Sequence, residues 1–287
     1  MRLTTALAGI VLASTLATPA SAKIWQQNWT VPGRANVHIV TNDGHVRVHV
    51  GPAGTVSAHI SHDVQVWGWS SASHDPLVEM RQDGSQVTIT ARTRGNLVVF
   101  GGVNEKFEID VTLPSECDLD VRSGDGGVDV EPVHGRISLE TGDGHLHASG
   151  LHGDLRLWTG DGGIDANELD GTLSARSGDG HLRVSGRFDR LELRTGDGSL
   201  EASVARGSKL TEPWSVETGD GSLLVRIPKN LQAMLDAHTA DGHLRVDLPI
   251  TVRGDVSGHD LRGALNEGSV PLRLRTGDGS LTLALSE

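Results

Sequence analysis

A short turn motif, Ser/Thr-Gly-Asp-Gly, recurs through the second half of the chain and constrains its fold more than any other feature. The first five copies follow one another at intervals of 18 residues, and the later copies are spaced more widely. Thr41-Asn42-Asp43-Gly44 is an early echo of the motif. Self-similarity at a fixed period predicts a repeat architecture, with one supersecondary unit per repeat. The aspartates of the eight copies, one of them degenerate, are Asp125, Asp143, Asp161, Asp179, Asp197, Asp220, Asp241 and Asp278.

Apolar and polar residues alternate on both sides of each turn. Ile137 and Leu139 alternate with polar neighbours before the turn at Asp143, as do Leu146 and Ala148 after it. A period of two predicts β-strands with one buried face. Each repeat is therefore expected to contain two short strands joined by the Gly-Asp-Gly turn, and helical spacing is absent from this region.

Two arrangements of these strands fit the pattern. Asp-Gly between alternating strands is a hairpin signal, which predicts an antiparallel meander. Alternatively, each repeat is one coil of a solenoid, and its strands stack on their copies about 4.8 Å away. The constant period favours the solenoid, in which Arg183 would lie between Asp165 and Glu201 at one outward position. We therefore expect an all-β fold, a short β-solenoid (β-helix-like) of about 18-residue coils over residues 115–287, with hairpins as the alternative.

The chain before the repeats is less regular. Residues 23–114 contain strand-like runs separated by turn signals, and we interpret them as an irregular N-terminal β cap. Such a cap would cover the open edge of the first coil. The C-terminal unit, residues 272–285, ends on a strand with no polar cap of its own. This edge is predicted to be exposed and available for self-association or for addition of a partner strand.

The N-terminus has the features of a signal peptide. A basic start at Arg2 precedes an apolar stretch, and Ala20-Ser21-Ala22 gives the small-residue pattern of a cleavage site. We place the signal peptide at residues 1–22. The apolar stretch is too short for a membrane span, and no other run approaches about 20 residues. We expect an exported protein, periplasmic or extracellular, without a membrane span.

Composition limits the core and the partners. Tyrosine is absent and glycine is abundant, which predicts a thin core of stacked aliphatic side chains. The net charge is −12, or −13 without Arg2, and this argues against nucleic acid or anionic lipid as a partner. Cys117 is the only cysteine, so no intramolecular disulfide can form. We expect it to be a small buried side chain and not a nucleophile, since no histidine partner can be named.

Two sets of residues could bind metal. Calcium-loaded β-rolls also have 18-residue coils, but they place an aspartate-bearing turn every nine residues, so simple turn chemistry is the alternative explanation. His134, His152 and Asp170 are 18 residues apart and would stack in a solenoid, where they could share zinc or copper. Solvated turn histidines are the alternative here. No cofactor is otherwise expected. The candidate calcium ligands are Asp125, Asp143, Asp161, Asp179 and Asp197.

Tryptophans offer a further binding chemistry. Trp67 and Trp69 would lie on the same face of a strand, a shape suited to stacking on sugar rings. Trp158 stands at an outward position that a polar residue occupies in the other repeats, so it should be exposed or covered by a neighbouring segment. Packing of the cap onto the coils is the alternative explanation, because tryptophan mostly serves packing.

Several motifs together resemble a known family. They are the run Phe107–Pro114, the Leu119-Asp-Val-Arg-Ser-Gly-Asp-Gly-Gly-Val segment, the Ser/Thr-Gly-Asp-Gly repeats and the closing Gly263–Gly268. This combination resembles the bacterial "putative adhesin" family of β-strand-repeat domains of unknown function, over essentially the whole mature chain. The resemblance implies a repeat-built, β-helix-like fold and brings no catalytic residues.

These observations favour a non-catalytic envelope or secreted scaffold, adhesin-like, that binds an unknown envelope protein or glycan. One alternative is a polysaccharide-active β-helix enzyme. Such an enzyme needs clustered carboxylates in a cleft, usually built by long loops, and only the insertions at 206–214 and 253–271 could supply them. A calcium- or transition-metal-binding β-roll is the other alternative.

Overall fold

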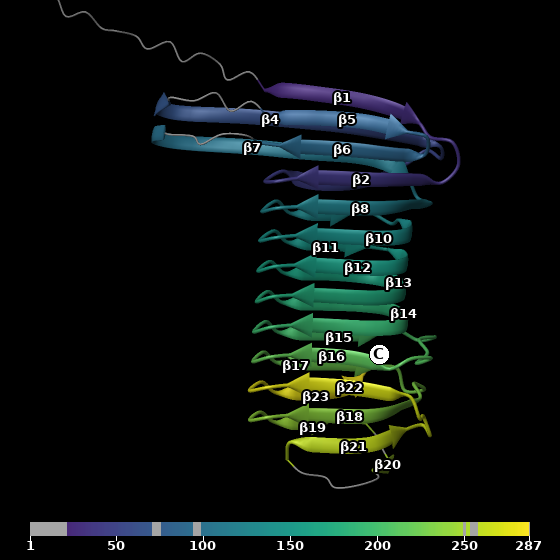
Figure 1. The fold of residues 1–287 in the computed structure, drawn as a ribbon. Coiled ribbons are helices and arrows are strands. Elements are labelled where there is room, and N and C mark those ends of the chain that lie inside the picture. The colour runs from purple at the N-terminus through teal and green to yellow at the C-terminus, as the bar shows by residue number, and fades with distance from the viewer. Residues whose placement is uncertain (1–21, 71–75, 94–98, 249–250, 253–257, 287) are drawn as a thin grey trace, which may run out of the picture.

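The computed structural model describes residues 22–70, 76–93, 99–248, 251–252 and 258–286. In these residues the protein is all-β, without helices, and its 23 strands form one mixed sheet that winds into an elongated stack (Figure 1). The described part of the chain therefore has no helix that could cross a membrane. Residues 1–21 of the predicted signal peptide lie outside the described part of the chain.

The strands are β1 (Lys23–Thr30), β2 (Ala35–Thr41), β3 (His45–Gly51), β4 (Thr55–Ser70), β5 (Leu77–Asp83), β6 (Gln86–Arg92), β7 (Val99–Pro114), β8 (Cys117–Ser123), β9 (Val128–Val130), β10 (His134–Thr141), β11 (Leu146–Ser149), β12 (His152–Thr159), β13 (Ile164–Ser177), β14 (Leu182–Thr195), β15 (Leu200–Val204), β16 (Trp214–Thr218), β17 (Leu223–Ile227), β18 (Ala233–Thr239), β19 (Leu244–Val246), β20 (Thr251–Val252), β21 (Asp260–Leu265), β22 (Pro271–Thr276) and β23 (Leu281–Leu285).

In the regular repeats, each strand pairs in parallel with its equivalent one repeat later. Ile137 of β10 lies opposite Leu155 of β12, and Leu146 of β11 lies opposite Ile164 of β13, a register of 18 residues. The two strands that flank one turn pair with neighbouring repeats: β10 with β8 and β12, β11 with β9 and β13. The antiparallel hairpin alternative is therefore wrong for these repeats.

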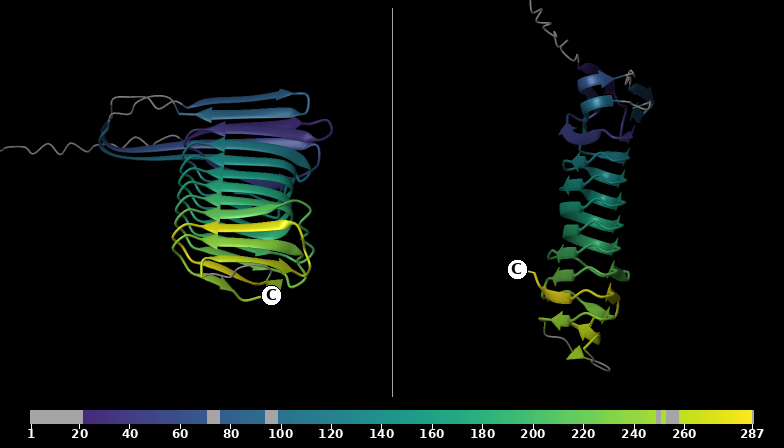
Figure 2. Two further views of the ribbon diagram at one scale, coloured as in Figure 1. Left: turned by 60° about the horizontal axis from the view of Figure 1, so that its bottom comes forward. Right: turned by 90° about the vertical axis from the view of Figure 1, so that its left-hand side faces the viewer.

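Each repeat thus forms one coil with two sides. We call the side built from the strand segments just before the Gly-Asp-Gly turns face A, and the side built from the segments just after them face B (Figure 2). β13 and β14 are long enough to contribute to both faces. Residues at the same position in successive coils form a row that runs along the stack. Leu155 and Leu157 of face A and Ile164 and Ala166 of face B point inward and are almost fully buried. This is the thin aliphatic core expected from the composition.

The hydroxyl residue before each turn forms a buried row. The Thr159 hydroxyl donates to the carbonyl oxygens of Gly144 at 3.1 Å and Gly142 at 3.2 Å in the preceding coil. A Cβ atom at Gly162 would overlap the Gly144 carbonyl oxygen, so the coils can approach this closely only with glycine there. These two contacts explain the Ser/Thr-Gly-Asp-Gly motif. In spatial order, the row consists of Thr41, Ser123, Thr141, Thr159, Ser177, Thr195, Thr218, Thr276 and Thr239.

The N-terminal end combines one coil with a cap. β2 and β3, joined by the turn at Asp43, stack in parallel on β8 and β9 and form a coil of residues 35–51. The sequence analysis included these residues in the cap, whereas the structure places them in the stack. Beyond them, β6 and β7 pair in parallel with β2 and β3, and β5, β4 and β1 add antiparallel strands.

The C-terminal unit lies inside the stack. β22 pairs in parallel with both β16 and β18, and β23 pairs with both β17 and β19. The coil of residues 271–285 is therefore inserted between the coils of 214–227 and 233–246, as the yellow strands in Figure 1 show. On face A the last coil is covered by antiparallel β21. The prediction of an exposed edge at this unit is wrong, because both of its strands are paired on both sides. Self-association of the protein stays a prediction.

Candidate functional site

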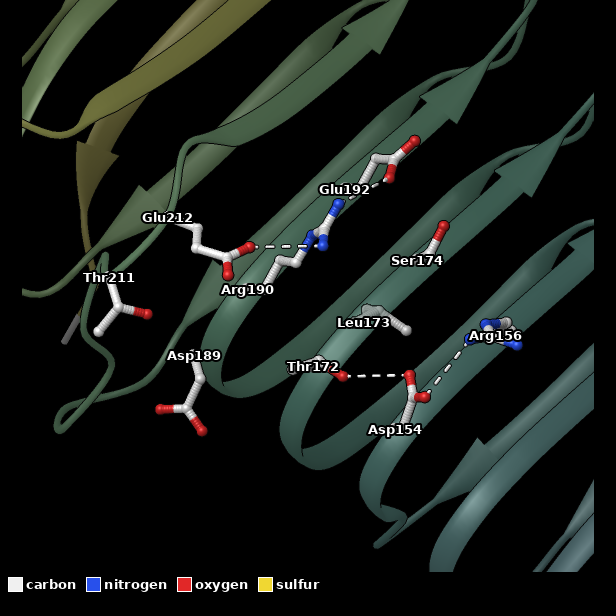
Figure 3. A pocket seen from close by; sticks show the side chains of 10 residues that line it. All are labelled: Asp154, Arg156, Thr172, Leu173, Ser174, Asp189, Arg190, Glu192, Thr211 and Glu212. Atoms are coloured by element: carbon white, nitrogen blue, oxygen red, sulfur yellow. Dashed lines mark hydrogen bonds and ion pairs between the residues drawn. The ribbon is translucent and has the colours of Figure 1, made fainter.

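The outward side of face A carries a hollow of about 590 Å³ (Figure 3). Its floor consists of side chains from three successive strands, among them Asp154, Thr172 and Arg190. Thr211 and Glu212 form a wall at one side, and they come from the segment between β15 and β16. The insertion at 206–214, which the sequence analysis named as a place for a site, therefore does line this hollow.

Two smaller hollows adjoin the first on face A. One, of about 330 Å³, lies over β8, β10 and β12 and is lined by Asp118 and Arg136. The other, of about 300 Å³, lies beside Trp158. Arg156 lines all three hollows, so they form one continuous surface around this side chain. We call the three hollows together the face A site.

The charged groups in the face A site are arranged as pairs. Asp154 accepts a hydrogen bond from the Thr172 hydroxyl at 3.2 Å and lies 3.5 Å from the Arg156 guanidinium. Arg190 lies 3.4 Å from Glu212 and 4.0 Å from Glu192 (Figure 3). A surface of paired charges on a rigid sheet can recognise a polar ligand through ion pairs and hydrogen bonds.

Asp118 is the most firmly held carboxylate of the site. Partial burial raises its pKa, but hydrogen bonds from the backbone and side chain of Arg136 and from Arg34 outweigh this and hold the pKa below the ordinary 3.8. The Arg136 contact is 2.8 Å and the Arg34 contact is 3.2 Å. The group is therefore an anion at neutral pH and a fixed acceptor.

Trp158 is the apolar element of the face A site. It is 45% exposed, which confirms the expectation from its row. Its neighbours in that row are Glu140 and Arg176, and Arg156 stands two residues away on the same side of β12. The hollow beside it thus offers an indole next to guanidinium and hydroxyl groups, which is a combination suited to a ligand with both apolar and polar faces.

The sequence analysis missed the alternation of charge along face A. Asp118, Arg136 and Asp154 occupy one position in three successive coils, and Arg190 follows two coils later. The signal was available, since residues 18 apart share a row. The column of Asp165, Arg183 and Glu201 on face B was predicted and is confirmed: Arg183 lies 2.8 Å from Asp165 and 3.5 Å from Glu201.

The predicted metal ligands His134, His152 and Asp170 lie in neighbouring coils, but two of them have other partners. The rings of His134 and His152 lie 4.4 Å apart between centroids, and Asp170 is opposite His152 in the register. Asp170, however, accepts a hydrogen bond from Arg187 at 2.9 Å, and His134 is 3.0 Å from Glu116. In the part of the chain that the structure describes, no three such side chains are grouped to hold a metal ion. A metal at these residues stays a prediction, which thermal unfolding with EDTA and with zinc would test.

The turn aspartates form an exposed row along one edge of the stack. All five regular copies are solvent-exposed at the Gly-Asp-Gly turns. A calcium ladder at Asp125, Asp143, Asp161, Asp179 and Asp197 likewise stays a prediction, to be tested by thermal unfolding with calcium.

The cysteine and the tryptophans are the remaining candidate residues. Cys117 is buried, and burial raises the pKa of its thiol to about 12, which agrees with the expected role as a small core side chain. Trp214 is fully buried and packs against Phe188 with ring centroids 6.5 Å apart. The side chains of Trp67 and Trp69 lie outside the described part of the structure.

The fold and the site define the protein as an all-β, repeat-built protein with a hollowed, charged face, and no catalytic centre is recognisable among its described residues. The chain belongs to the Toastrack DUF4097 family, whose sequence profile matches residues 37–284. The resemblance to an adhesin-like family of unknown function is therefore confirmed. No curated protein matches the chain in sequence.

Several solved structures resemble the chain over nearly their whole length. The "putative adhesin" of Parabacteroides merdae is 11% identical, with a TM-score of 0.43, and the match covers 91% of this chain and 96% of that one. The "putative lipid binding protein" of Parabacteroides distasonis is 10% identical, with a TM-score of 0.44 and coverage of 92% and 98%. The "putative adhesin" of Bacteroides fragilis is 10% identical, with a TM-score of 0.40 and coverage of 92% and 97%. Identity and TM-score are low, so no functional conclusion follows from these matches.

Proposed function

We propose that this protein is an exported, non-catalytic scaffold, adhesin-like, that binds an envelope glycan or envelope protein through the face A site. In fold terms we propose a short β-solenoid with an N-terminal cap. The observation that carries the proposal is the continuity of the three hollows around Arg156 on an exposed, rigid face. Side chains fixed on strands give a more precise binding surface than side chains on loops.

The ion pairs support a binding role over a catalytic one. Glycoside hydrolysis needs one carboxyl group that holds a proton and a second that is ionised, facing each other across the substrate. In the hollow of about 590 Å³, Glu212 and Glu192 share Arg190, and Asp189 accepts a hydrogen bond from Arg187 at 2.7 Å. Each of these three carboxylates is thus engaged with a guanidinium group, which suits a charged binding surface.

A polysaccharide-active enzyme is the second candidate. It is favoured by one observation, the wall of Thr211 and Glu212 that an insertion places beside the hollow of about 590 Å³. The two candidates differ in the fate of a bound glycan, since an enzyme would shorten it and a scaffold would not.

The proposal is tested by binding of the mature protein, residues 23–287, to an array of bacterial envelope glycans and envelope protein fractions. Ser174→Glu would place a charge and extra bulk in two of the hollows, because Ser174 lines both. Ser185→Glu is the matched control in a hollow on face B. We expect Ser174→Glu to abolish binding and Ser185→Glu to preserve it.

Equal binding by both variants would place the function elsewhere on the molecule. Glycan products of lower mass after incubation would establish the enzyme in place of the scaffold.

A further inference from the structure

We propose that Trp158 and Arg156 form a subsite for one hexuronate unit of an acidic glycan, in which the indole stacks on the sugar ring and the guanidinium binds its carboxylate. This inference deepens the proposed function and rests on it, because it names the ligand class of the face A site.

The first argument concerns the place of Trp158. Single exposed apolar side chains are ordinary on protein surfaces. Trp158 differs because it stands in the middle of a polar face and lines a hollow of about 300 Å³. The open ring face of an exposed indole beside such a hollow can stack on the apolar C–H face of a pyranose ring.

The second argument concerns the space around Arg156. Its neighbours in the row on either side are Ser138 of β10 and Ser174 of β13. Both side chains are short, so the guanidinium is flanked by open space that the hollow occupies, and both hydroxyls line that hollow. Each hydroxyl can donate and accept a hydrogen bond, which suits the hydroxyl groups of a sugar.

The third argument concerns the charge available at Arg156. Its side chain is 72% exposed, and its ion pair with Asp154 is long, at 3.5 Å. Two other arginines of this face are engaged more closely: Arg136 lies 2.8 Å from Asp118, and Arg176 lies 2.5 Å from Glu192. Arg156 therefore keeps capacity for a new bidentate bond to a carboxylate.

The spacing of the two side chains fits one sugar unit. Arg156 and Trp158 are alternate residues on one side of β12, so their Cα atoms are about 6.6 Å apart. The carboxylate of a hexuronate projects from the edge of its ring. A ring placed over the indole therefore directs its carboxylate along the strand toward Arg156. The negative charge of the whole protein opposes long-range attraction of a polyanion, so recognition depends on these local contacts.

The test is titration calorimetry of the mature protein with tetrasaccharides that contain galacturonate, mannuronate or glucuronate. We expect saturable binding to at least one of them, and about tenfold weaker binding to its methyl ester, which keeps the ring and removes the charge. Trp158→Ser and Arg156→Gln are each expected to weaken binding about fivefold to tenfold.

Arg245→Gln is the matched control on face B. Arg245 is 73% exposed and, like Arg156, pairs with an aspartate two residues away on its own strand, Asp247 at 2.9 Å. This variant should bind as the unaltered protein does. Lack of binding to all three tetrasaccharides would overturn the proposal, as would equal loss in Arg156→Gln and Arg245→Gln. A protein that binds other envelope components through face A but none of these uronates would retain the proposed function and lose this subsite.

Discussion

At the scale of single residues, the buried hydroxyl row links the turn to the stack. Beyond Thr41 in the first coil, each Thr or Ser of the row donates to a glycine carbonyl of the preceding coil, as Thr195 does to Gly180 at 2.9 Å. A buried carbonyl without a donor is costly, so the hydroxyl stabilises the contact between coils in addition to filling space.

Thr159→Val is expected to lower the free energy of unfolding by about 1–2 kcal/mol, because it leaves the Gly144 carbonyl without this donor while the shape is kept. Urea denaturation followed by tryptophan fluorescence measures the effect. The control is Thr172→Val, whose hydroxyl bonds Asp154 at the surface (Figure 3) and whose loss should cost about 0.5 kcal/mol or less. Equal effects would show that the buried row contributes nothing beyond packing.

Cys117 should be chemically silent in the folded protein. Its burial raises the pKa of the thiol to about 12, and the thiolate is the reactive form. We expect no labelling by iodoacetamide at pH 8 in native buffer and complete labelling in urea. Rapid labelling in native buffer would show that the β8 strand opens readily or that the thiol is accessible.

At the scale of elements, the Gly-Asp-Gly turns set how closely coils approach. Gly162→Ala is expected to cost about 3 kcal/mol or more, since the added Cβ would meet the backbone of the coil beneath, which cannot move without separating the strands. Thermal unfolding measures the loss. Gly258→Ala is the control, because no atom in the described part of the chain lies within 4 Å of a Cβ at that position. A small effect at Gly162 would mean that the turns tolerate a wider spacing.

The repeat elements were predictable because their physics is local. Period-two alternation and the 18-residue spacing indicate strands and their register, and both appear in the pairing of β10 with β12. The place of the C-terminal coil was not predictable in the same way. The units 214–227, 233–246 and 271–285 carry the same alternating inward pattern and nearly the same turn, with Ala240 in place of the first glycine in the second unit, so the pattern alone does not choose their order of stacking.

Only two parts of the candidate site could be predicted from the sequence, the wall formed by the insertion and the exposed Trp158. Sequence analysis identified the insertion at 206–214 and the outward indole, and both lie at the face A site. It did not identify Arg156, because an exposed arginine beside an aspartate is ordinary in a strand. Its distinction depends on its neighbours in adjacent coils, Ser138 and Ser174, which become neighbours only after the parallel register is known.

At the scale of the whole molecule, ion pairs connect the coils along the stack. Arg187 donates to Asp170 at 2.9 Å, and this hydrogen bond holds the pKa of Asp170 below its ordinary 3.8. The hydrogen bond from Arg226 to Glu201 is the largest of the causes that hold the pKa of Glu201 below the ordinary 4.5. A carboxyl group with a lowered pKa stabilises the folded state above its ordinary pKa, and this contribution disappears as the pH falls through the folded value.

Stability should therefore fall on acidification, beginning near the ordinary carboxyl values of 4.5 and 3.8 and continuing below them. Urea midpoints measured from pH 7 down to pH 3 check this. Asp170→Asn should be less stable than the unaltered protein at pH 7 and closer to it at pH 3. A constant difference between the two proteins over this range would show that the Asp170 charge does not contribute.

Leu283→Asp should be among the most damaging single changes, with a loss of about 4 kcal/mol or more, because Leu283 is fully buried and its strand pairs on both sides. Val246→Asp, in the neighbouring β19, should cost less, since Val246 is only partly buried. Circular dichroism during urea unfolding provides both values. A larger loss at Val246 would contradict the inserted position of the C-terminal coil.

The inserted C-terminal coil also determines when the molecule can be completed. A chain emerging from the ribosome exposes residues 214–227 and 233–246 well before residues 271–285, yet these two coils do not touch through their strands in the finished stack. Strands β18 and β19 find their parallel partners in β22 and β23, not in β16 and β17. Residues 233–246 can therefore take their place in the stack only together with residues 271–285, which come later in the chain.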